Sequence, residues 1–144
     1  MIEKDTVRLL RECDAGTKMG ISSIDDVLDN VKNDEFKNKL AICKEKHEDL
    51  ECKIRACLNR FSDDGKEPNA IAKGMSWMKT NAKLAFDESD NTIADLITDG
   101  CNMGVKSLSK YLNQYKAADE ESKDLAKKLI ATEADLAIDI RMYL

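Results

Sequence analysis

Two stretches of this chain repeat each other 84 positions apart, and that repeat limits the possible folds more than any other feature of the sequence. GTKMGISSIDDVLDNVK begins at Gly16, and GCNMGVKSLSKYLNQYK begins at Gly100. Six of the aligned pairs are identical: Gly16/Gly100, Met19/Met103, Gly20/Gly104, Ser23/Ser107, Leu28/Leu112 and Lys32/Lys116. A short acidic turn and a further helical pattern follow each copy. The chain therefore reads as a duplicated helical hairpin.

Apolar residues recur at i, i+3, i+4 and i+7 along four long segments, which is the spacing of amphipathic helices. The four expected helices cover about residues 3–32, 34–62, 90–116 and 119–144. Asn33 is the predicted N-cap of the second helix, because its side chain can accept from a free backbone N–H. The repeated glycines cost roughly 1 kcal/mol each inside a helix. They indicate a close approach between the first and third helices.

The connections between these segments predict the topology. KNDE and KAADE join the helices within each hairpin, and such short links make antiparallel neighbours. About 27 residues separate the hairpins, and they contain a predicted crossover helix at 71–86, roughly 24 Å long. That length lets the chain run back along the bundle, so the second and third long helices are expected to be parallel. The predicted fold is an all-α four-helix bundle, forming one domain over 1–144.

Two antiparallel hairpins joined by one long crossover is the connection found in ferritin-like proteins. ITDGCNMGVKSLSKYLNQYKAADEESKDLAKKLI and the crossover NAIAKGMSWMKTNAKL resemble a small bacterial ferritin-like family of unknown function. The resemblance covers nearly the whole chain. It implies a ferritin-like fold and does not specify an activity.

The charge pattern excludes several classes of protein. Charged residues make up 35% of the chain, with a net charge of -5 and both signs interspersed, which argues against a nucleic-acid binder. No apolar run reaches the roughly 18 residues that a membrane span needs. The start, MIEKDTVRLL, lacks a signal-peptide pattern, so we expect a cytoplasmic protein whose five cysteines are reduced.

A polar layer is predicted across the middle of the bundle. His47, the only histidine, lies in CKEKHEDLEC, and it shares the apolar stripe of its helix with Cys43. Glu133 occupies the matching place in the fourth helix, Asp14 in the first and Cys101 in the third. Thr17 lies beside Asp14 in the first helix's stripe. Because burying an unpaired carboxylate or imidazole costs several kcal/mol, we expect these groups to be paired.

Three interpretations of this layer compete. In the first, it is a hydrogen-bonded plug in which Glu133 accepts from His47, and Asp14 bonds Thr17 or a water. In the second, Asp14, His47 and Glu133 hold Fe or Zn, with Cys43 or Cys101 as an optional soft ligand. In the third, a helix is rotated and the layer does not assemble. The chain has no Glu-x-x-His, so it lacks the ligand set of a ferritin-like di-iron centre.

We therefore expect a non-catalytic interaction or structural module with a buried polar layer, and we assign no catalytic residues. The alternative is a metal-binding or metal-dependent redox protein with a reduced Fe or Zn site. No membrane or nucleic-acid partner is expected. A homodimer is a further possibility, with the crossover helix and its Trp77 as the contact surface.

Overall fold

Four long helices account for most of the residues that the computed structural model describes, which are 2–68 and 89–144. The elements are α1 (Ile2–Leu28), α2 (Asp34–Arg60), α4 (Asp90–Gln114), α5 (Glu120–Asp139) and a short 3₁₀ helix η1 (Arg141–Tyr143). Over these residues the chain is all-α and contains no strand, as predicted. The predicted crossover helix at 71–86, with Trp77, lies outside the described residues.

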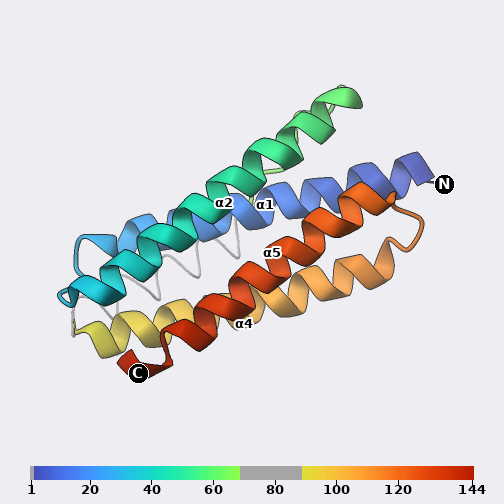
Figure 1. Ribbon diagram of the computed structural model, residues 1–144. Helices are drawn as coiled ribbons and strands as arrows, with labels where there is room; N and C mark the ends of the chain where they lie inside the picture. The colour runs from blue at the N-terminus through green and yellow to red at the C-terminus, as the bar shows by residue number, and fades with distance from the viewer. Residues whose placement is uncertain (1, 69–88) are drawn as a thin grey trace.

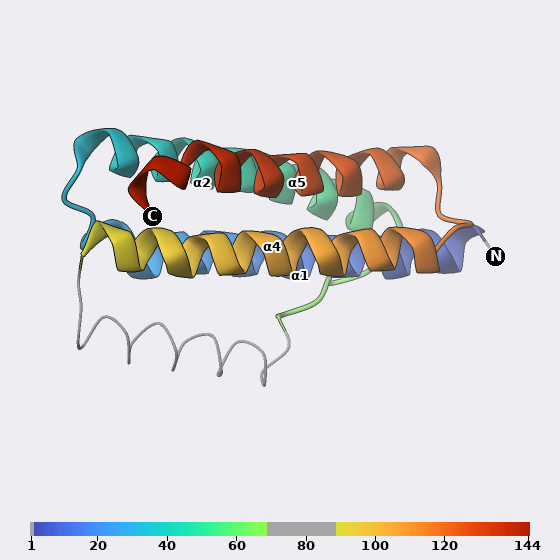
Figure 2. The same ribbon diagram turned by 90° about the horizontal axis from the view of Figure 1, so that it is seen from below.

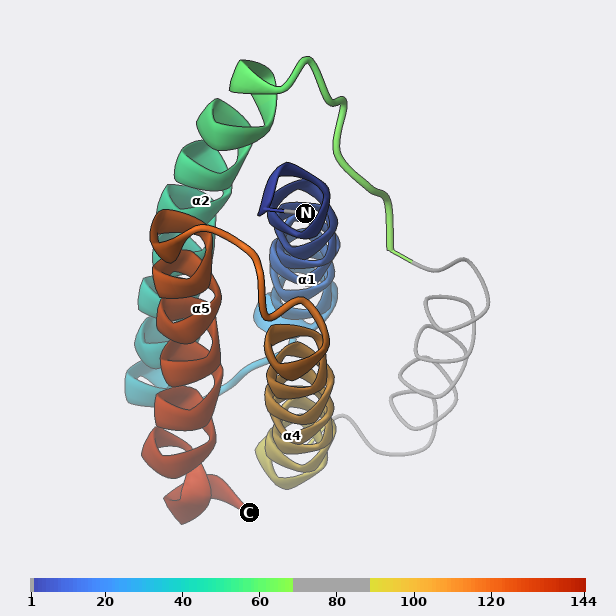
Figure 3. The ribbon, with the colours of Figure 1, turned by 90° about the vertical axis from the view of Figure 1, so that its right-hand side faces the viewer.

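The helices form two layers, and each layer contains one helix from each hairpin. Figure 1 shows the α1–α2 hairpin beside the α4–α5 hairpin. In Figure 2, α1 and α4 lie together in one layer, and α2 and α5 lie together in the other. The end-on view in Figure 3 shows the same pairs. The hairpins therefore meet face to face along the length of the bundle.

Polar side chains fix where the helices begin. The Asn33 side chain accepts a hydrogen bond from the Phe36 backbone N–H at 2.9 Å, which confirms the predicted N-cap of α2. Ser89 caps α4 and Asp119 caps α5 in the same way. Each cap satisfies a backbone N–H that the first turn of the helix leaves without an intrahelical partner.

The first and last helices end earlier than the apolar pattern predicts. α1 was expected to reach residue 32 and ends at Leu28. The backbone N–H groups of Lys32 and Asn33 instead donate to the Asp90 carboxylate, at 2.9 and 3.0 Å. At the other end, α5 stops at Asp139, and Tyr143 in η1 stacks on Phe36 with ring centroids 4.5 Å apart. Contacts with other helices therefore determine where α1 and α5 end.

Each hairpin caps the turn of the other. Asp90, at the start of α4, holds the α1–α2 turn. Near the start of α1, Asp5 accepts from Ala117 N–H at 3.1 Å, and Thr6 accepts from Asp119 N–H at 2.8 Å, so they hold the α4–α5 turn. The contacts place the start of α4 beside the start of α2, so these two helices run parallel (Figure 1).

The apolar core formed by residues 2–68 and 89–144 has two clusters, one on each side of the polar layer. Leu50 of α2 and Leu129 of α5 belong to the cluster toward the α4–α5 turn. Phe36 of α2 and Leu136 of α5 belong to the other. Burying such a side chain fully contributes roughly 1.5–3 kcal/mol, so the clusters supply most of the stability. His47 lies between them on its helix and is itself buried.

No helix in the two described segments is long and apolar enough to cross a membrane.

Candidate functional site

A buried imidazole–carboxylate pair joins the two hairpins at the middle of the bundle. His47 projects from α2 and is 1% exposed, and Glu133 projects from α5 and is 8% exposed. The His47 Nε2 and Glu133 Oε1 atoms are 2.6 Å apart. The predicted hydrogen bond between these two residues is therefore confirmed. Since they belong to different hairpins, the contact links the two halves of the duplication.

The other ring nitrogen of His47 determines where the protons lie. His47 Nδ1 is 2.8 Å from the backbone carbonyl oxygen of Cys43, one turn earlier in α2. A carbonyl oxygen can only accept, so Nδ1 carries a proton and donates it. Nε2 then either donates to an ionised Glu133 or accepts from a protonated one. Both nitrogens are occupied in either case.

The electrostatic surroundings favour the ionised pair. Burial by itself lowers the pKa of His47, because it takes the imidazolium away from water. The side-chain hydrogen bonds to Cys43 Sγ and to Glu133, together with the charge of Glu133, outweigh burial and raise the pKa of His47 to about 10. The raised pKa keeps the His47 ring protonated at neutral pH, so an imidazolium faces the Glu133 side chain.

Two thiols border the pair, Cys43 on α2 and Cys101 on α4. Cys43 Sγ is 3.5 Å from His47 Nδ1. Cys101, on α4, is 2% exposed and hydrogen-bonds Glu133. Burial raises the pKa of the Cys101 thiol, and the Glu133 charge raises it further. A thiol whose pKa is raised is a poor nucleophile and a poor metal ligand at neutral pH, because both roles need the thiolate.

The repeated glycines make room for the pair. A Cβ atom on Gly20 would lie 2.6 Å from both Cδ2 and Nε2 of the His47 ring. A Cβ on Gly104 would meet Glu133 at an ordinary 3.4 Å. We expected the glycines to bring the first and third helices together. The structure gives a more specific reason for Gly20, which leaves space for a side chain arriving from α2.

The pair occupies equivalent positions in the two hairpins. His47 and Glu133 are 86 residues apart, and so are the N-caps Asn33 and Asp119. Aligning α2 with α5 by their N-caps therefore superposes His47 on Glu133. Gly20 and Gly104 are already equivalent within the repeat. The site lies where the two copies of the duplicated hairpin face each other.

Asp14 belongs to a different cluster, and the prediction that it shares the layer with His47 is wrong. Asp14 precedes Gly20 by six residues, about 9 Å along α1. Its carboxylate is fully buried and contacts Lys18 Nζ at 2.9 Å and the Lys66 backbone N–H at 3.0 Å. Thr17 donates to the Asp14 backbone carbonyl at 2.9 Å, not to the carboxylate.

The Asp14 cluster ties the segment after α2 to α1. Gly65 has φ +88°, a value that side-chain-bearing residues rarely adopt, and a Cβ there would collide with the Asp14 carboxylate. Asp14 Oδ1 lacks a hydrogen-bond partner among the described residues, and Arg55 Nη2 lies 3.7 Å from it. The role of Asp14 is to hold residues 65 and 66 against the bundle.

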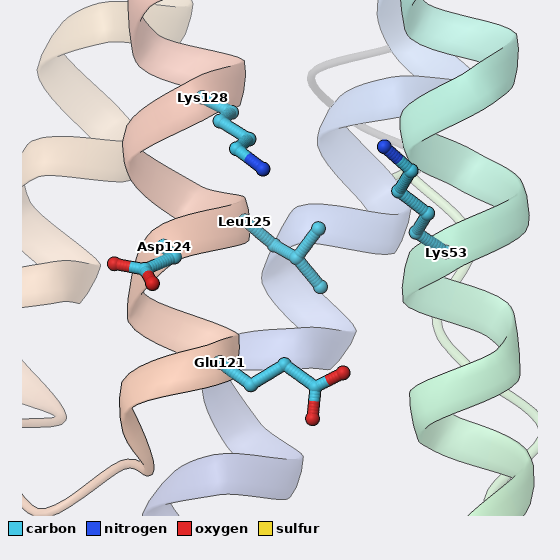
Figure 4. A pocket seen from close by; sticks show the side chains of 5 residues that line it. All are labelled: Lys53, Glu121, Asp124, Leu125 and Lys128. Carbon is cyan, nitrogen blue, oxygen red and sulfur yellow. The ribbon is translucent and has the colours of Figure 1, made fainter.

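A shallow groove runs between α2 and α5 on the outer face of their layer. Figure 4 shows the side chains that line it, with Lys53 on α2 and the others on α5: Lys53, Glu121, Asp124, Leu125 and Lys128. Glu121 is paired with Arg60 at 2.8 Å. The groove is partly open to solvent and carries charges of both signs around one leucine, unlike the enclosed, mostly apolar pockets that bind small molecules.

The predicted metal ligands do not gather into one set. Cys43, His47, Glu133 and Cys101 lie together, whereas Asp14 does not. Within 2–68 and 89–144, no group of three or more His, Cys, Asp or Glu residues is arranged to hold a metal ion. The residues also do not fit a ferritin-like di-iron centre, which needs a Glu-x-x-His pair from each of two helices.

Comparison with known proteins finds no family model, no curated protein and no solved structure that matches this chain.

Proposed function

We propose that this chain is a non-catalytic structural or interaction module with ferritin-like topology. The observation that carries the proposal is that both ring nitrogens of His47 are already hydrogen-bonded within the bundle. Both ring nitrogens of His47 are committed, to Cys43 O at 2.8 Å and to Glu133 Oε1 at 2.6 Å, and the ring is 1% exposed. A general acid or base must come within hydrogen-bond reach of its substrate. This histidine reaches only its own chain.

The proposed role of the pair is to fix how the hairpins dock. Removing one partner of a buried ion pair leaves an uncompensated charge and costs about 3–5 kcal/mol, so the pair penalises any docking that separates its members. The reciprocal caps at Asp90 and Thr6 act at the two ends of the bundle, while the pair acts in the middle. Together these contacts specify one register.

A second candidate, a metal-binding or redox protein, has one observation in its favour. A metal-bound histidine commonly donates its other ring N–H to a backbone carbonyl, and His47 Nδ1 does so to Cys43. Against it, two ligands on one tetrahedral zinc ion lie roughly 3.3 Å apart for typical bond lengths. His47 Nε2 and Glu133 Oε1 are 2.6 Å apart, so an ion would have to push them apart.

Metal analysis of protein purified without a histidine tag separates the two candidates. The structural proposal predicts substoichiometric zinc and iron, and a melting curve that a chelator leaves unchanged. Stoichiometric metal that disappears in His47→Ala and Glu133→Ala would refute it. Asp14→Ala is the matched control, because Asp14 is an equally buried carboxylate outside the layer.

A further inference from the structure

The contacts between the hairpins are reciprocal, as in the interface of a symmetric dimer. Asp90 of the second hairpin caps the turn of the first, and Thr6 of the first caps the turn of the second. Asp90 and Thr6 are themselves 84 positions apart, which makes them equivalent in the repeat. In an isologous interface each patch binds its own counterpart. The interface within this chain has that property.

His47 and Glu133 break the symmetry at its centre. Two N-terminal hairpins docked in this way would bring two imidazoles together. Two C-terminal hairpins would bring two carboxylates together in a buried place, where like charges repel strongly. Only the docking of an N-terminal hairpin on a C-terminal hairpin joins an imidazolium to a carboxylate. The pair therefore discriminates between partners by penalising the wrong ones, and not only by stabilising the right one.

We infer that a second copy of this chain can bind by exchanging hairpins, so that the face between the hairpins is a self-recognition surface. The His47–Glu133 pair selects the docking of an N-terminal hairpin on a C-terminal hairpin. The N-terminal hairpin of one copy then docks on the C-terminal hairpin of the other. This inference rests on the structural role proposed above and adds a partner to it.

The link between the hairpins is long enough for exchange. Asp14 holds Lys66 against α1 in the N-terminal hairpin, and the 22 residues from there to Ser89 can extend to about 70 Å. The helices themselves are about 40 Å long at 1.5 Å per residue. Every contact between hairpins in one copy can be remade between two copies, which is why exchange is a low-cost route to a dimer.

Two full-length variants with mismatched pairs test the inference. H47E places two carboxylates at the centre of the chain, and E133H places two imidazoles there. When the two variants are unfolded together and refolded, an exchanged dimer contains one imidazole and one carboxylate at each centre. We expect native mass spectrometry to show the mixed dimer enriched about tenfold or more over either like dimer, and the mixture to melt above both separate variants.

The matched control uses Lys44 and Asp25, which form an ion pair at 2.6 Å within the N-terminal hairpin. Exchange leaves both residues in the same hairpin, so K44E and D25K refolded together should form no excess of mixed dimer. An equal excess in this control, or no mixed dimer from H47E and E133H, would overturn the inference.

The separate variants keep this result distinct from the proposed function. If H47E and E133H are each destabilised but fail to combine, exchange is refuted and the structural role of the pair stands. If neither variant is destabilised, the structural role itself is refuted. If neither H47E nor E133H folds alone, exchange predicts that the two variants regain helical structure when they are refolded together. A mixture without a helical signal in circular dichroism would then refute exchange.

Discussion

Replacing Gly20 by alanine should destabilise the protein, although alanine is the better helix former. The substitution gains about 1 kcal/mol of helix propensity. It also puts a Cβ 2.6 Å from two atoms of the His47 ring, which two hydrogen bonds hold in place. Overpacking of this kind costs about 1–3 kcal/mol. Displacing the ring loses a charged hydrogen bond worth about 1.5–3 kcal/mol. The expected net loss is about 1.5–5 kcal/mol.

Two other glycines in the repeats provide matched controls. The added methyl of Gly100→Ala meets no atom of residues 2–68 or 89–144 within 4 Å, so this change should stabilise the protein by about 1 kcal/mol. Gly104→Ala meets Glu133 at 3.4 Å and should change stability by between 0 and about +1 kcal/mol. Urea unfolding followed by circular dichroism measures all three. If Gly20→Ala proves as stable as Gly104→Ala, the account of the glycine is refuted.

Three further predictions follow from the same contacts. Glu133→Gln should lower the free energy of unfolding by about 3–5 kcal/mol and lower the pKa of His47 in an NMR titration; an unchanged pKa would refute the pairing. Because the pKa of His47 is raised above its unfolded value, its stabilisation is complete below about pH 6.5 and is lost as the pH rises toward 10. The free energy of unfolding from urea titrations should therefore fall by about 2 kcal/mol between pH 7 and 8.5, and this fall should shrink in Glu133→Gln. Gly65→Ala should lower the melting temperature because of its positive φ and its collision with Asp14, whereas the neighbouring exposed Asp64→Ala should not.

Periodicity predicted which side chains point inward, and it did so well. Within CKEKHEDLEC it placed Cys43 and His47 on the inward face of the helix, and both are buried. It also placed Glu133 in the core of the last helix. A helical repeat gives the direction of a side chain reliably, because each residue advances by about 100°.

The position of a side chain along the bundle axis was harder to predict than its direction. Asp14 was expected beside His47 because it also faces inward near the middle of its helix. Direction alone does not say how far one helix is shifted along another, and α1 places Gly20, not Asp14, at the level of His47. The sequence did contain a usable signal. Aligning α2 with α5 by their caps, Asn33 and Asp119, pairs His47 with Glu133 directly.

The contact between Asp14 and the segment after α2 could not have been found from a pattern. In that contact the Asp14 carboxylate accepts from the backbone N–H of Lys66, a group that every residue except proline also possesses. The positive φ of Gly65 depends on how the segment after α2 turns back toward α1. Such contacts depend on tertiary packing and leave no periodic trace in the sequence.

The protonation of His47 is the most direct test of the account. Nitrogen-15 NMR at pH 7.5 on protein labelled at histidine distinguishes an imidazolium, a neutral ring and a metal-bound ring, and the chain has only one histidine to assign. The account predicts that both Nδ1 and Nε2 carry protons, donated to Cys43 O and to Glu133 Oε1. An Nε2 without a proton, in a neutral ring or in one bound to a metal, would contradict it.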